Sequence, residues 1–159
     1  MAPSYRKRLM LLDEILNDAI RLFKMLHQSE EQLREQLITG DYRALIETEK
    51  NRSLLQEQIT ALEERRTALA PEGTGLRKYI KTKIGKSSQA DLLTKLAAVL
   101  EELREIKVLN EVNRSLMVER LRFSKELQEA LLAAKMTYNE RGRLTQEDED
   151  SFRNLDRNC

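Results

Sequence analysis

Helix-breaking residues are so sparse in this chain that long segments run without interruption. Between residues 4 and 141, glycine and proline occur only at position 40 and within residues 71–85. A sheet of several strands needs turns far more often than this spacing permits. The abundant Leu, Glu, Lys, Arg, Gln and Ala, by contrast, favour helices. The predicted fold class is therefore all-α, with few and long helices.

Apolar residues recur every three or four positions along these segments, as in amphipathic helices. They predict long helices at about residues 4–38, 41–69 and 88–138, and a short helix at about 75–84. Gly40 followed by Asp41 is typical of a helix stop and a new N-cap, so the first two helices should be antiparallel neighbours. In the second helix, Ile46 is expected on the inward side with Leu55 and Leu62. The expected architecture is an antiparallel bundle of three long helices (residues 1–138) with a mobile C-terminal tail (residues 139–159).

Charge and cysteine content argue against several classes of function. The 28 basic and 27 acidic side chains give a net charge of +1, so no overall field recruits nucleic acid or anionic membrane. Cys159 is the only cysteine, which leaves no intrachain disulfide and favours a reducing compartment. Asp13 and Glu14 interrupt the N-terminal apolar stretch far short of a signal peptide or a membrane span. A cytoplasmic location without membrane insertion is expected.

The sequence contains no recognisable catalytic or metal-binding motif. His27 is the only histidine, so a histidine pair or a Cys/His cluster for zinc is excluded, and a Cys–His dyad is not expected. Gly85-Lys86-Ser87 resembles the end of a phosphate-binding loop, but Ile80 stands where the first glycine is required. No cofactor or metal is expected, and the sequence predicts a helical interaction protein rather than an enzyme.

The predicted short helix carries a cluster of basic side chains on its polar side. These are Arg77, Lys78, Lys81, Lys83 and Lys86. One interpretation is that these side chains, together with Tyr79, contact the phosphate backbone of a nucleic acid. A solvated helix face is favoured, because the patch is short, has a single aromatic residue and belongs to a nearly neutral chain.

Two asparagines interrupt the apolar side of the third helix. Asn110 and Asn113 are three residues apart, so they share a helix face with Ile106 and Met117. Burying an amide is costly unless it is hydrogen-bonded. We therefore expect a structural polar layer in which Asn110 and Asn113 hydrogen-bond across the helices and fix the position of the third helix, with Lys50 opposite as a partner. Contact with a partner protein is the alternative.

The asparagine pair also belongs to a longer pattern. LNEVN (residues 109–113), upstream of TYNERG (residues 137–142), resembles the third-helix signature of the FlgN-type flagellar export chaperones. GDYRAL (residues 40–45), leading to Glu49-Lys50, is similar to the start of that family's second helix. Arg65-Arg66 lies where such chains carry a basic residue at the end of this helix. The resemblance covers most of residues 9–142.

This resemblance implies a cytoplasmic chaperone for flagellar hook-associated (hook-filament junction) proteins. Such a chaperone binds their helical terminal segments, prevents premature assembly and delivers them to components of the type III export apparatus. The resemblance places partner binding in the distal third helix and the tail, where the candidate residues are Leu127, Leu131, Tyr138, Leu144, Phe152 and Leu155. The alternative is a homodimeric coiled-coil adaptor unrelated to flagella, which would need no foreign partner.

Overall fold

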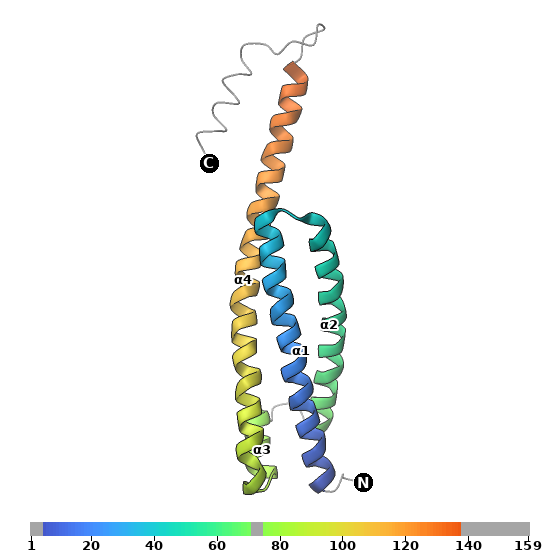
Figure 1. The fold of residues 1–159 in the computed structure, drawn as a ribbon, viewed down its shortest axis with the longest axis vertical. Coiled ribbons are helices and arrows are strands. Elements are labelled where there is room, and N and C mark those ends of the chain that lie inside the picture. The colour runs from blue at the N-terminus through green and yellow to red at the C-terminus, as the bar shows by residue number, and fades with distance from the viewer. Residues whose placement is uncertain (1–4, 71–74, 138–159) are drawn as a thin grey trace. The chain divides into compact units, whose positions relative to one another are not determined.

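The computed structural model describes residues 5–70 and 75–137. Within these ranges it contains four helices and no strand: α1 (Tyr5–Thr39), α2 (Tyr42–Leu69), α3 (Leu76–Lys83) and α4 (Lys86–Thr137), all shown in Figure 1. The prediction of an all-α fold with few, long helices is confirmed. The predicted helix bounds agree with the observed ones to within two residues.

The chain divides into two compact units. The first unit is Met1–Leu116 and the second is Met117–Cys159, so the boundary falls within the residues of α4. The first unit holds α1, α2, α3 and the start of α4. The predicted boundary between residues 138 and 139 lies outside the described residues.

The short connection between α1 and α2 depends on the backbone conformation of Gly40. Its φ of 76° lies in the left-handed region, and its N–H donates to the carbonyl oxygen of Gln36 at 2.8 Å. The side chain of Asp41 then accepts a hydrogen bond from the N–H of Ala44 at 3.1 Å, which caps the start of α2. The chain thereby reverses and α2 runs back along α1.

Gly40→Ala should lower the free energy of unfolding by about 1 kcal/mol, because a residue with a Cβ pays roughly that much in the left-handed region. No other heavy atom lies within 4 Å of a Cβ at this position, so the cost is purely conformational. Denaturant unfolding of the purified protein measures it. Gly75→Ala is the control, since φ is −59° there and the space is also open. Equal losses at the two positions would contradict this account of the turn.

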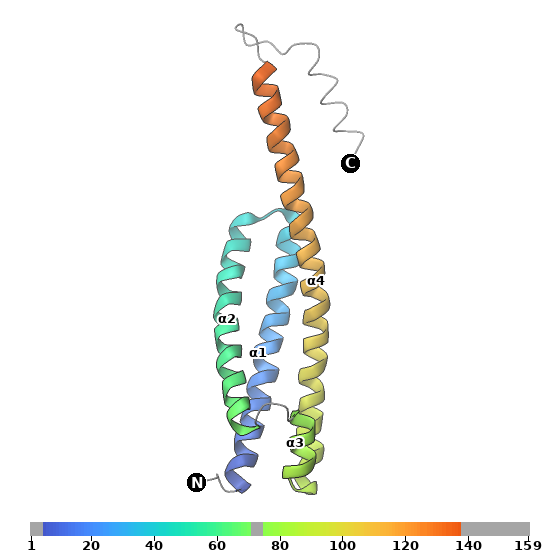
Figure 2. The ribbon, with the colours of Figure 1, turned by 180° about the vertical axis from the view of Figure 1, so that it is seen from behind.

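The core of the first unit forms around α1. In both views α1 lies between α2 and the first part of α4 (Figures 1 and 2), and it buries a stripe of residues at three- and four-residue spacing. The buried apolar cluster comprises Leu12, Ile15, Leu16, Ala19, Leu22, Leu55, Leu62, Ala70, Tyr79, Ile80, Ile84, Leu92, Leu96 and Val99. The first unit is thus a helical bundle whose central member is α1.

Polar contacts define the directions of the helices. Arg65 Nη1, near the end of α2, donates to Asp18 Oδ2 in the first half of α1 at 2.7 Å. Arg52, earlier in α2, contacts Glu30, later in α1, so these two helices are antiparallel. Lys95 pairs with Asp13, and the N–H of Gly85 donates to the hydroxyl oxygen of Tyr5 at 2.8 Å. Positions along α4 therefore increase together with positions along α1, and the two helices run parallel.

The inward face of α2 differs from the predicted one at Ile46. That side chain is exposed, whereas Thr48, Leu55 and Leu62 are buried at seven-residue spacing. Ile46 lies two residues before Thr48, which turns it about 200° away from the stripe that contacts α1. The prediction that Ile46 points inward is wrong.

The short helix α3 covers one end of the core with Tyr79 and Ile80, both buried. The side chains of the basic cluster are all exposed, as expected for a solvated face. Because the ring of Tyr79 is buried, it is not available to stack on a nucleobase. A contact of this cluster with nucleic acid would therefore lack an aromatic side chain that could stack on a base.

Candidate functional site

A buried carboxylate occupies a core position of α1. Glu30 is completely buried, although it is charged. It lies four residues after Leu26 and three and seven residues before Leu33 and Leu37, which are also core-facing positions. The helical repeat therefore directs its side chain inward, where an apolar residue would be expected.

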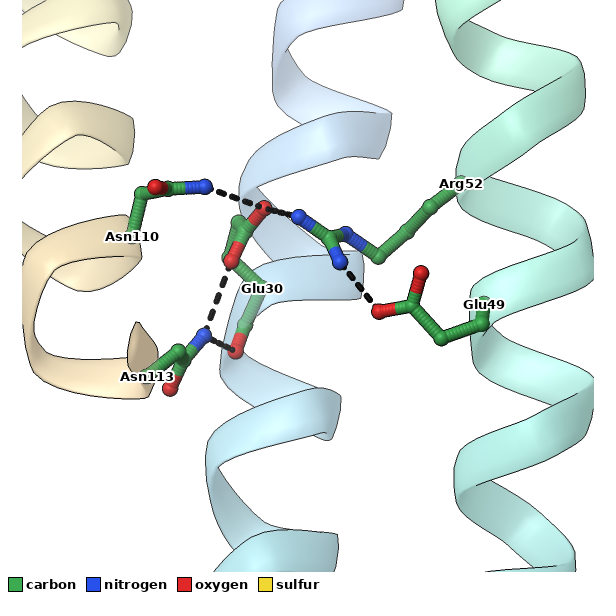
Figure 3. A network of polar contacts seen from close by, with 5 residues as sticks. All are labelled: Glu30, Glu49, Arg52, Asn110 and Asn113. Carbon is green, nitrogen blue, oxygen red and sulfur yellow. Dashed lines mark hydrogen bonds and ion pairs between the residues drawn. The ribbon is translucent and has the colours of Figure 1, made fainter. Parts of the chain in front are cut away.

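Side chains from two other helices converge on Glu30, as Figure 3 shows. From α2, Arg52 Nη2 donates to Glu30 Oε1 at 2.5 Å, and Arg52 also pairs with Glu49. From α4, Asn113 Nδ2 donates to Glu30 Oε2 at 2.8 Å and to the backbone carbonyl oxygen of Glu30 at 2.9 Å. Asn110 Nδ2 lies 3.4 Å from Oε1. These residues, called the Glu30 cluster below, join all three long helices at one level.

The Glu30 cluster compensates for a large desolvation cost. A carboxylate is seldom buried without a cation and several hydrogen bonds, because the isolated charge loses its hydration. Here Arg52 supplies the cation and Asn113 supplies the principal amide donor. Two buried atoms of the same side chains, Arg52 Nε and Asn113 Oδ1, have no hydrogen-bond partner among the described residues. The hydrogen-bonding capacity of the Glu30 carboxylate is therefore met more completely than that of Arg52 and Asn113.

The predicted polar layer differs from the observed one in two members. Asn113 is buried in the Glu30 cluster, whereas Asn110 is exposed at the edge of the cluster. Lys50 is exposed, and the contact that was predicted for Lys50 is made by Arg52. The reason is the helical repeat of α2: Arg52 follows buried Thr48 by four residues, whereas Lys50 follows it by two and points away.

Sequence reasoning missed Glu30 altogether. The signal that identifies it is its position in the apolar repeat of α1, where Leu26, Leu33 and Leu37 surround it at core spacing. A charged residue at such a position predicts a buried charge with a partner on a neighbouring helix. Arg52 and Asn113 are the matching polar residues on the inward faces of α2 and α4.

A second polar group, called the His27 cluster, lies between α1 and α4. His27 Nδ1 is 2.9 Å from Glu102 Oε2 and 3.3 Å from Glu105 Oε2. On the other side of the ring, Nε2 is 3.9 Å from Glu31 Oε1. The hydrogen bond to Glu102 raises the pKa of His27 above its ordinary value against the opposing effect of burial, and the charges of Glu102, Glu31 and Glu105 add to the increase.

His27 should stabilise the fold more at acidic than at alkaline pH. Its folded-state pKa is raised, so its contribution is fully present below the unfolded pKa of about 6.5 and is lost as the pH rises through the folded value. In chelator-containing buffer, the free energy of unfolding should therefore differ more between wild type and His27→Gln at pH 5.5 than at pH 9. Urea unfolding at both pH values measures the difference. A larger difference at pH 9 would contradict this pairing.

In the second unit, residues 117–133 of α4 expose large apolar side chains. Leu121 is 71% exposed and Phe123 is 52% exposed. Phe123, Leu127 and Leu131 share one side of the helix at four-residue spacing and are called the α4 apolar face below, whereas the exposed Val118, Leu121 and Leu132 lie on the other side. The polar side chains of the same turns include Arg122 and Glu126, whose Nε and Oε1 atoms form an ion pair at 3.1 Å. This part of α4 therefore exposes a row of three large apolar side chains at four-residue spacing, with further apolar side chains around the helix.

Two of the predicted partner-binding residues, Leu127 and Leu131, belong to the α4 apolar face. The other four, Tyr138, Leu144, Phe152 and Leu155, lie outside the described residues. Leu121 and Phe123 were not among the predicted binding residues. Phe123 continues the four-residue spacing of Leu127 and Leu131, and this spacing is the signal that identifies it, whereas Leu121 lies outside that row.

The first unit also has an apolar hollow of about 170 Å³. Its lining comes from α1, α2, α3 and α4 and includes Phe23, Ile59, Leu76, Leu100 and Leu103. Leu100 and Leu103 are each more than one-third exposed. The hollow is a further apolar surface of this chain, and it belongs to the first unit.

Comparison with known proteins adds no relative. The chain matches no protein-family model, no curated protein and no solved structure. Among the described residues, no helix has both the length and the apolar character needed to cross a membrane.

Proposed function

We propose that this protein is a cytoplasmic export chaperone for flagellar hook-associated proteins. It binds their helical terminal segments, prevents premature assembly and delivers them to the type III export apparatus. In this proposal the three long helices form an up-down-up bundle, in which α2 is antiparallel to both α1 and α4, and the chain has a binding function rather than a catalytic one. The α4 apolar face is the observation that carries the proposal, together with the sequence resemblance of residues 109–113 and 137–142.

An exposed apolar helix face favours binding for a simple physical reason. Each square ångström of apolar surface removed from water contributes about 25 cal/mol, and large exposed patches are typical of interaction sites. An amphipathic helix from another protein is the natural occupant, because its apolar stripe matches three- and four-residue spacing. Such a contact would replace the helix partners that an export substrate lacks before assembly.

The expected affinity is moderate, and this suits a chaperone. A segment that folds on binding loses conformational entropy, which lowers the affinity per unit of buried area. Release to the export apparatus then needs no chemical step in the chaperone. The Glu30 cluster has a supporting role in this proposal, since it holds α4 against α1 at residues 110–113.

A homodimeric coiled-coil adaptor is the second candidate, because the α4 apolar face also suits a copy of itself. Size-exclusion chromatography with light scattering separates the two. The full chain is run alone and with a purified hook-filament junction protein, beside a chain that ends at Tyr138. A stoichiometric complex supports the chaperone, and weakening by truncation adds residues 139–159 to the binding surface. A stable homodimer that forms no complex at micromolar concentration would overturn the proposal in favour of the adaptor.

A further inference from the structure

We propose that His27, Glu102 and Glu105 form a binding site for a divalent transition-metal ion of the Zn²⁺ type, which links α1 to α4. The inference is independent of the proposed function, because it rests on the first unit alone. The three residues offer one imidazole nitrogen and two carboxylate oxygens, a donor set that zinc and cobalt accept.

The spacing of the donor atoms matches that of ligands around one ion. Zinc lies about 2.0–2.2 Å from nitrogen and oxygen ligands, so two adjacent ligands are roughly 2.9 Å apart in an octahedral arrangement and 3.4 Å apart in a tetrahedral one. His27 Nδ1 lies 2.9 Å from Glu102 Oε2 and 3.3 Å from Glu105 Oε2. The three donor atoms all lie within 4.8 Å of one another. Small side-chain adjustments therefore suffice for all three to bind one ion.

The two helices hold these donors in place before an ion binds. Glu102 and Glu105 are three residues apart, so they project from the same face of α4. The side chains of His27 and Glu102 are only 21% and 20% exposed, which restricts their motion. The side chain of Glu105 is about half exposed and provides a route from solvent. The two carboxylates also balance the charge of a divalent ion.

The far side of the imidazole has a suitable second partner. When Nδ1 binds a metal ion, the ring proton resides on Nε2, and metal-bound histidines usually donate it to a carboxylate or a carbonyl group. Glu31 Oε1 lies 3.9 Å from Nε2 and can reach hydrogen-bonding distance by a small rotation. Glu31 is thus a positioning residue for the ligand His27. The nitrogen donor selects Zn²⁺ or Co²⁺ over Mg²⁺ and Ca²⁺, which prefer oxygen ligands alone.

Isothermal titration calorimetry with ZnCl2 tests the site in the full chain after chelator treatment. Cys159→Ser serves as the background, so that the terminal thiol does not contribute a ligand. We expect one ion per chain with a Kd on the order of 10 μM, a higher Tm with Zn²⁺ and no shift with millimolar Mg²⁺. Co²⁺ should give a visible absorption band that depends on His27.

Single substitutions then assign the ligands. His27→Gln should abolish binding and Glu105→Gln should weaken it at least tenfold, whereas Glu31→Gln should weaken it about tenfold through the imidazole. Glu101→Gln is the matched control on α4, since Glu101 is exposed and pairs with Arg104, and it should leave the Kd unchanged. Binding that survives both His27→Gln and Glu105→Gln, or a wild-type Kd above about 1 mM, would overturn the proposal. Glu105→Gln changes a half-exposed residue, so it keeps the test valid if His27→Gln fails to fold.

Discussion

Arg52→Ala should lower the free energy of unfolding by about 3 kcal/mol and Tm by roughly 10 °C. The substitution removes the cation that contacts the buried Glu30 carboxylate and leaves that charge to Asn113 and Asn110. Breaking a buried ion pair from one side typically costs 3–5 kcal/mol, and the remaining amide donors favour the lower end of that range. Urea unfolding and a thermal melt measure the loss.

Two further variants make this prediction specific to the buried charge. Arg104→Ala removes an arginine that pairs with Glu101 on the exposed side of α4, and it should cost less than about 0.5 kcal/mol. A triple variant that carries Leu at positions 30, 52 and 113 removes the charge together with its partners, so it should recover most of the lost stability. If Arg52→Ala were as mild as Arg104→Ala, the Glu30 cluster would not depend on its cation.

Leu127→Ala combined with Leu131→Ala should weaken the binding of a hook-associated terminal segment about 100-fold. Each leucine contributes about 1.5 kcal/mol or more when it is buried at an interface, and 3 kcal/mol corresponds to roughly a 100-fold change in Kd. Both side chains are about half exposed in the free chain, so Tm should change little. Fluorescence anisotropy with a labelled terminal segment measures the Kd.

The opposite side of the same helix provides the control for this experiment. Arg122→Ala combined with Glu129→Ala removes two exposed polar side chains from the same turns and should change the Kd less than threefold. Equal effects of the two double variants would show that partner binding does not select the α4 apolar face. An unchanged Kd in both would indicate that the segment binds elsewhere, and the hollow beside Leu100 and Leu103 would be the next surface to test.

The helices could be predicted from the sequence because their ends depend on local chemistry. Gly40 and Asp41 stop one helix and cap the next through their own backbone and side chain. The short helix ends before Gly85, and its inward residues Tyr79 and Ile80 follow a simple repeat. None of these features requires knowledge of a distant residue.

The polar clusters could be predicted only in part, because their partners lie far apart in the sequence. Asn113 was identified as a costly residue on the inward face, but nothing in its neighbourhood indicates that Glu30 is its acceptor. The choice between Lys50 and Arg52 depends on which side of α2 faces α1, and a polar stretch gives a weak periodic signal. The contact between His27 and Glu102 also depends on how α4 lies along α1, which no local sequence feature indicates.

The sequence separations within the Glu30 cluster bear on the order of folding. Arg52 is 22 positions from Glu30, whereas Asn113 is 83 positions away. Closing the longer loop costs more chain entropy, so the α1–α2 hairpin should associate first, including on the ribosome before α4 has been synthesised. At that stage the pair between Glu30 and Arg52 remains hydrated on the side that Asn113 later covers. Docking of α4 should then complete the burial of the ion pair between Glu30 and Arg52.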